Sequence, residues 1–105
     1  MLFRSYMNDE RTLTVTQARV YPLKVTPEMG RLRGLAQVEL EGAILLRGLR
    51  IMAGENPDDL LVTMPMDTFY KGEDFKALIT LNAGTGKAVT EAVLAKYREC
   101  LAQEG

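Results

Sequence analysis

Residues 31–52, which read RLRGLAQVELEGAILLRGLRIM, decide the fold of this protein. Small or apolar side chains alternate with other residues as far as Leu40, which is typical of a strand with one buried face, and a second extended segment begins at Ala43. Glu41-Gly42 stands between them, where a two-residue hairpin turn is expected. The stretch therefore predicts an antiparallel β-hairpin in which Leu40 faces Ala43.

The register that follows from this turn gathers the apolar residues on one face. That predicted face consists of Leu32, Gly34, Ala36, Val38, Leu40, Leu45, Leu49 and Ile51. On the opposite face Arg33 lies directly across from Arg50, with Arg31 next along. A slip of one residue would scatter the apolar set, so the hydrophobic pattern itself favours this register.

The flanking segments predict three more strands. Alternation over residues 13–25 indicates a strand with a slip of phase near Gln17, which could mark a bulge. Residues 60–64 form a short apolar run that stops at Pro65, because proline cannot donate to a strand ladder. Residues 75–81 complete the set as a last strand.

A helix is expected at the end of the chain. Thr85 is its predicted N-cap, and it runs to about Gln103. Its apolar stripe consists of Val89, Val93, Leu94, Tyr97, Cys100 and Leu101. The element order is thus β-β-β-β-β-α, an α+β chain with an N-terminal extension over residues 1–11 and a single domain over residues 12–105.

Composition excludes several classes of function. The chain has 105 residues, 47% of them hydrophobic, and a formal net charge of −1, which fits one globular domain. Without a histidine and with Cys100 as its single cysteine, it lacks the residues of a zinc site or of a Ser-His or Cys-His catalytic site. We therefore expect no cofactor, no metal and no small-molecule substrate. Because no apolar run is long enough for a signal peptide or a membrane span, we also expect a cytoplasmic protein with no membrane contact.

One motif invites a nucleotide-binding interpretation. Gly84-Thr85-Gly86-Lys87 precedes helical sequence, but a phosphate-binding Walker A loop would need glycine where Leu81 stands and Ser or Thr where Ala88 stands. A weaker hypothesis is that the helix start and Lys87 hold one backbone phosphate. A capped helix start with a solvated lysine explains the motif equally well.

The arginines of the hairpin are the main functional clue that the residues themselves give. Like charges directly opposite on a sheet destabilise it, so the predicted pairing of Arg33 with Arg50 suits an anion such as a phosphate backbone. Acidic residues concentrate instead in loop sequence over 55–59 and 67–74. The alternative is that these arginines are solvated, or pair with carboxylates of a partner subunit.

One helix leaves much of such a sheet uncovered. Leu35, Ile44, Leu46 and Met52 fall on the predicted outer face, and sheet edges attract partners. A two-fold homodimer would cover both and would double the number of hairpin arginines available to bind nucleic acid.

Four short blocks resemble the SpoVG family, the stage V sporulation protein G or septation proteins of bacteria. They are GRLRGLA at 30–36, LRGLRI at 46–51, LVTMP at 61–65 and AVLAKY at 92–97, in the order and spacing of that family. The resemblance covers about residues 14–97. It implies an α+β fold with a meandering antiparallel sheet of about five strands and a C-terminal helix, and an intertwined homodimer. It also implies binding of DNA, and in some members RNA, by a regulator linked to septation and sporulation.

The chain departs from the family pattern on the surface that would meet nucleic acid. Asp67 stands where the family commonly has a base, Lys76 keeps a positive charge but Ala77 replaces an aspartate, and Thr80-Leu81 replace a His-Pro pair. These changes bear on nucleic-acid binding more than on the fold.

The sequence therefore predicts a cytoplasmic, non-catalytic homodimer that binds DNA or RNA. Regulation of gene expression or septation is what the resemblance alone implies. The predicted contact residues are Arg31, Arg33, Arg50, Lys76 and Lys87. The alternative is a dimeric interaction protein that has lost nucleic-acid binding. A small enzyme has no constellation of residues to support it.

Overall fold

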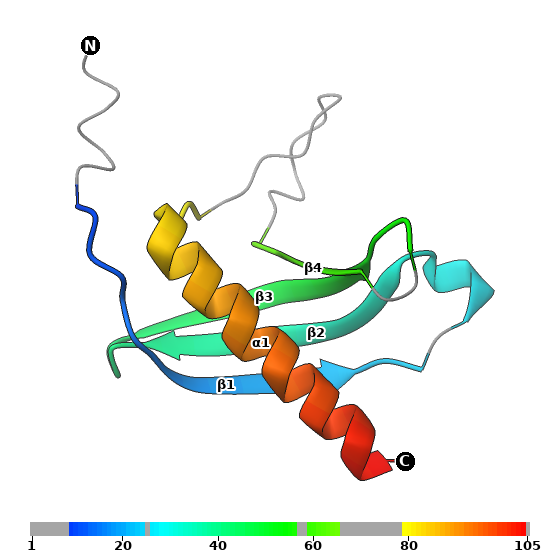
Figure 1. The fold of residues 1–105 in the computed structure, drawn as a ribbon. Helices are drawn as coiled ribbons and strands as arrows, with labels where there is room; N and C mark the ends of the chain where they lie inside the picture. Colours follow the sequence, from blue (N-terminus) through cyan, green and yellow to red (C-terminus); the bar gives the residue numbers. More distant parts are fainter. Residues whose placement is uncertain (1–8, 25, 57–58, 66–78, 105) are drawn as a thin grey trace.

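Four antiparallel strands form one sheet, and one helix lies across a single face of it (Figure 1). The computed structural model describes residues 9–24, 26–56, 59–65 and 79–104. The strands are β1 (Val15–Pro22), β2 (Leu32–Leu40), β3 (Ile44–Ala53) and β4 (Leu60–Thr63), in the sheet order β1-β2-β3-β4. A short 3-10 helix, η2 (Pro27–Met29), joins β1 to β2, and α1 (Ala83–Glu104) ends the fold.

This architecture confirms the predicted antiparallel sheet followed by a C-terminal helix. The predicted slip of phase near Gln17 is also confirmed, because the β1–β2 ladder shifts register between Val15 and Gln17. Most of the predicted fifth strand, residues 75–81, lies outside the described residues, and its last three residues belong to no strand. No helix in the described part of the chain is long and apolar enough to cross a membrane.

The hairpin turn forms where the sequence predicts it, but the register that leaves it is different. The Ala43 N–H donates to the Leu40 carbonyl at 2.9 Å. Glu41 and Gly42 have φ angles of 55° and 64°, the left-handed values of a tight hairpin turn. Leu40 faces Ile44 rather than Ala43, so the predicted pairing is wrong by one residue.

A bulge in β3 shifts the register a second time. Val38 faces Leu46 and Ala36 faces Leu49, which leaves Arg47 and Gly48 both opposite Gln37. Gly48 has a φ of 82°, a conformation that glycine adopts without the steric cost paid by other residues.

The extra residue in the turn, Ala43, and the extra residue of the bulge, Gly48, together decide which leucines of β3 face the core. Leu46 is 5% exposed and Leu45 is 49% exposed, the reverse of the prediction. Because the second shift restores the original alternation, Leu49 and Ile51 face the core as predicted, each with no exposed surface.

The core lies between the sheet and α1. Its buried members are Val20, Ala36, Val38, Leu40, Leu46, Leu49, Ile51, Val89, Val93 and Tyr97. The helical stripe is thus confirmed at its centre, with Leu94 and Cys100 packed at the edge and Leu101 exposed.

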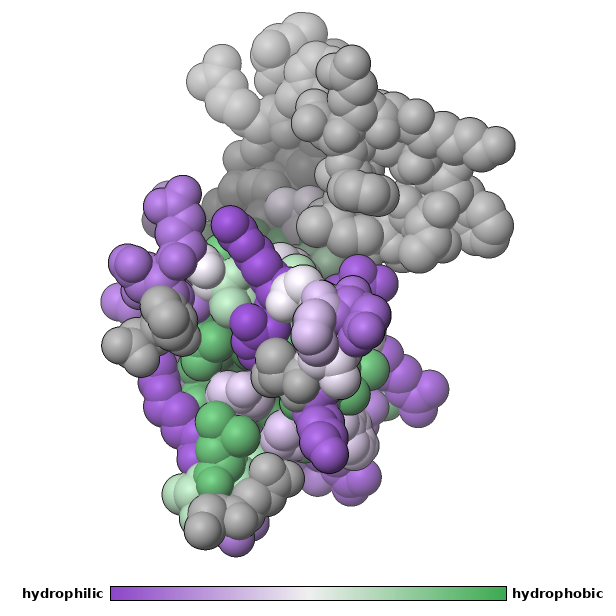
Figure 2. All heavy atoms as spheres, turned by 90° about the vertical axis from the view of Figure 1, so that its right-hand side faces the viewer, coloured by the Kyte–Doolittle hydropathy of each residue, from purple (hydrophilic) through white to green (hydrophobic). Residues whose placement is uncertain are grey.

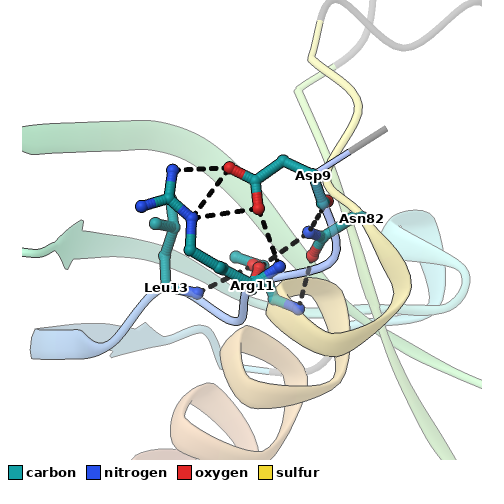
Figure 3. Close-up of polar contacts among 5 residues, drawn as sticks. Asp9, Arg11, Leu13 and Asn82 are labelled. Carbon is teal, nitrogen blue, oxygen red and sulfur yellow. Dashed lines mark hydrogen bonds and ion pairs between the residues drawn. The ribbon is translucent and has the colours of Figure 1, made fainter. Parts of the chain in front are cut away.

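The start of α1 is fastened to the N-terminal segment (Figure 3). The Asn82 carboxamide oxygen accepts the Thr85 N–H at 2.9 Å, and its nitrogen donates to the carbonyls of Asp9 and Arg11, both at 2.8 Å. The Thr85 hydroxyl accepts the Leu13 N–H at 3.0 Å. The predicted N-cap at Thr85 is therefore wrong: Asn82 caps the helix, and Thr85 is buried in the first turn.

Candidate nucleic-acid interface

The face of the sheet away from α1, called the outer face here, carries cationic and apolar side chains together. Its exposed members are Arg19 and Tyr21 of β1, Leu35 of β2, Leu45, Arg47 and Arg50 of β3, and Leu61 of β4. Figure 2 views the molecule along the strands, from the right-hand side of Figure 1, and hydrophobic side chains there reach the described surface between hydrophilic ones.

The strand ladders bring these residues into two neighbouring rows. Tyr21 faces Leu35, Leu35 faces Arg50, and Arg50 faces Thr63, so one row crosses all four strands. In the next row Arg19 faces Gln37, which lies opposite the β3 bulge that contains Arg47. We call Arg19, Tyr21, Leu35, Arg47 and Arg50 the arginine–tyrosine patch.

The predicted opposition of Arg33 and Arg50 is wrong. The β2–β3 register shifts between Leu32 and Gly34, which makes Arg33 an extra residue with no partner across the ladder. Its guanidinium Nη1 donates to the carbonyls of Gly30 at 2.8 Å and Leu32 at 3.0 Å. Arg33 is half-buried and fastens the start of β2.

The other predicted contact residues do not gather on one face. Arg31 is exposed in the turn before β2, at the end of the sheet. Lys87 is exposed on α1, the layer that covers the opposite face of the sheet from Arg50. Lys76 lies outside the described residues.

The arginines of the patch have no ion-pair partner among the residues that the structure describes. Within that part of the chain, ion pairs join Arg11 to Asp9 and Lys96 to Glu99. On the outer face, the carboxylate of Glu39 accepts the Thr16 hydroxyl at 2.8 Å. Glu39 lies one row from Arg19 and Arg47, towards the hairpin turn, and two rows from Arg50. Within the described ranges, the positive charge of the patch is therefore not neutralised by an ion pair.

The start of α1 suits a phosphate less well than the sheet does. A depression of about 490 Å³ there is lined by Asp9, Glu10, Leu81, Asn82, Ala83 and Gly84. Hydrogen bonds from Arg11 lower the pKa of the Asp9 carboxyl to about 2, so this carboxylate is negative at neutral pH. The Thr85 N–H is already bonded to Asn82, and the carboxylate of Glu10 in the lining opposes an anion, whereas the charge of Asp9 is paired with Arg11.

Sequence reasoning missed Arg19, Tyr21 and Arg47 as members of one surface. The signal for β1 was available, since Val20 is apolar and its two neighbours must point the other way in a strand. Arg47 could not be assigned to a face without the bulge at Gly48.

Comparison with known proteins gives two matches. The SpoVG family profile matches residues 13–99. A curated relative, the "Putative septation protein SpoVG" of Oceanobacillus iheyensis, is 33% identical over 70 residues, which span 67% of this chain and 71% of the relative.

Proposed function

This chain belongs to the SpoVG family, and from that premise we propose that it is a non-catalytic regulatory protein that binds DNA or RNA. The name of the Oceanobacillus relative further supports a role connected with septation. Arg19, Arg47 and Arg50 are the proposed phosphate contacts, and Arg31, Lys76 and Lys87 are secondary candidates.

The observation that carries the proposal is a cluster of exposed arginines in the arginine–tyrosine patch that form no ion pair with any residue the structure describes. Three exposed arginines lie within two neighbouring rows of the sheet, and no described carboxylate pairs with them. Like charges held together repel unless an anion intervenes, and a phosphate backbone supplies regularly spaced anions. The segregation of acids to the hairpin end and the loops allows this in a chain of net charge −1.

We propose in addition that two copies associate. Ile44 and Leu45 are 46% and 49% exposed at the hairpin end of the sheet, away from the Arg50 row. Burying them against a second copy would remove apolar surface from water and would leave the arginine–tyrosine patch open.

The test of nucleic-acid binding is a fluorescence anisotropy titration with labelled duplex and single-stranded oligonucleotides at several salt concentrations. The double variant Arg47→Ala/Arg50→Ala is compared with Lys87→Ala/Arg98→Ala, which removes the same charge from the exposed side of α1. For duplex DNA we expect a log–log salt slope of about −0.9 for each phosphate neutralised, and a slope shallower by about 1.8 in the first variant.

Each outcome decides between proposals. Loss of affinity in the sheet variant alone supports the outer face as the interface. Loss in the α1 variant alone rejects that face and favours the helix side. A wild-type protein that binds no oligonucleotide rejects the proposal, and the alternative of a dimeric interaction protein then stands.

A further inference from the structure

Tyr21 presents an aromatic ring to solvent on the outer face, near the end of the edge strand β1. Of the two aromatic residues in the described part of the chain, Tyr97 on α1 is buried against the sheet and Tyr21 is 51% exposed. Its neighbour Val20 is buried at 8% exposure, which fixes the alternation of β1 and turns Tyr21 away from the helix. No described hydrogen bond holds the phenol group in place.

The surroundings of Tyr21 combine an apolar neighbour with cations. Leu35 lies directly across on β2 and is 40% exposed, and Arg50 follows in the same row. Arg19 lies two residues earlier on β1, on the same face. Arg19 lies about 7 Å from Tyr21 along β1, and Arg50 lies two strand spacings, or about 10 Å, across the sheet. Extended arginine side chains can span these distances, so both guanidinium groups can reach the ring.

A second copy of the chain fits this patch poorly. A two-fold interface places the same patch of each copy against the other, so the arginines of one copy would meet the arginine-bearing patch of the other. Removing such charges from water without carboxylate partners is costly, and no described carboxylate pairs with them. The charge of the patch therefore favours an anionic occupant that also offers apolar surface.

We infer that the outer face binds single-stranded nucleic acid, with a base stacked on Tyr21 and Leu35 and its flanking phosphates held by Arg19 and Arg50. Unpaired bases offer a π-face to an aromatic side chain, whereas the bases of a duplex are stacked on each other and withdrawn from a flat sheet. This inference rests on the proposed nucleic-acid binding and adds that single strands are preferred.

The test compares Tyr21→Ala and Tyr21→Phe with the wild type. As a control, Leu101→Ala truncates an apolar residue that is 42% exposed on α1. Affinities are measured for single-stranded DNA, single-stranded RNA and duplex DNA of one sequence. Stacking of one base predicts that Tyr21→Ala weakens single-strand binding by about fivefold to 150-fold. We expect duplex binding to change less than twofold, Tyr21→Phe to retain wild-type affinity, and the control to be unaffected.

Four results would overturn the inference. Unchanged single-strand affinity in Tyr21→Ala, while Arg47→Ala/Arg50→Ala loses binding, rejects the stacking but keeps the proposed function. An equal loss for duplex and single strand rejects the strand preference. A change from dimer to monomer in Tyr21→Ala by analytical ultracentrifugation assigns the patch to a second copy. Absence of any wild-type binding removes both proposals together.

Discussion

Arg50 lies opposite Leu35 in the ladder between β2 and β3, and it does not face Arg33. As a consequence, the two arginines have different structural roles. Arg33 hydrogen-bonds to backbone carbonyls at the start of β2, whereas Arg50 stands exposed in a row with Tyr21.

This division predicts opposite phenotypes for two alanine substitutions. Arg33→Ala removes both hydrogen bonds to the carbonyls of Gly30 and Leu32, so it should lower the free energy of unfolding by about 1 kcal/mol. Arg50→Ala should leave stability within about 0.5 kcal/mol and should weaken nucleic-acid binding. Urea denaturation and anisotropy titration measure the two effects. If Arg33→Ala weakened nucleic-acid binding and Arg50→Ala lowered stability instead, the phosphate contact would lie at Arg33.

The bulge in β3 should depend on Gly48. With a φ of 82°, a side chain at this position is strained, so Gly48→Ala should lower the free energy of unfolding by about 1–2 kcal/mol. Gly86→Ala is the matched control, because Gly86 lies in α1 and an added Cβ would meet nothing within 4 Å. That control should stabilise the protein by up to about 1 kcal/mol. Equal effects in urea denaturation would argue against a strained bulge.

Asn82 should couple the N-terminal segment to the helix. Its side chain caps α1 and also donates to the carbonyls of Asp9 and Arg11, so Asn82→Ala removes three hydrogen bonds at once. We expect a loss of about 1–2 kcal/mol and faster amide hydrogen exchange over residues 11–13. Asn56→Ala, in an exposed loop, is the control and should cost less than about 0.5 kcal/mol. Unaltered exchange near Leu13 would contradict the coupling.

The pair formed by Asp9 and Arg11 makes the stability of the folded state depend on pH in the acidic range. The pKa of Asp9 is lowered from 3.8 to about 2, chiefly by hydrogen bonds from Arg11. A carboxyl whose pKa is depressed by folding stabilises the folded state above pH 3.8, and this contribution is lost as the pH falls through about 2. Its size is small because the pair is fully exposed.

An NMR titration of the Asp9 carboxyl measures this directly. The midpoint should move back toward 3.8 in Arg11→Ala, whereas Arg11→Lys, which keeps the charge but not the planar fork, should give an intermediate value. A midpoint that stays near 2 without Arg11 would assign the shift to another group.

The proposed dimer predicts that the hairpin end is the contact. Leu45→Lys places a charge among exposed apolar residues and should convert a dimer to a monomer in sedimentation equilibrium. Leu61→Lys, on the edge strand β4, is the control and should leave the association unchanged. A monomeric wild type, or dissociation by the control alone, would contradict this contact.

The sequence by itself determined the elements and most of the core. Alternation with a period of two predicted β2, β3 and the buried Val38, Leu49 and Ile51, and the helical stripe predicted Val89 and Val93. Such patterns are local, because each buried position is set by neighbours on its own strand or helix.

Only the tertiary structure decided where the strands slip past one another. Ala43 adds one residue to the turn before β3, Gly48 adds one to β3, and Arg33 adds one to β2. The position of a bulge is fixed by how both strands pack against α1. The alternation of apolar residues along one strand does not carry that information. The register decides what faces Arg50, so the composition of the arginine–tyrosine patch followed from packing. The presence of arginines in the hairpin followed from sequence alone.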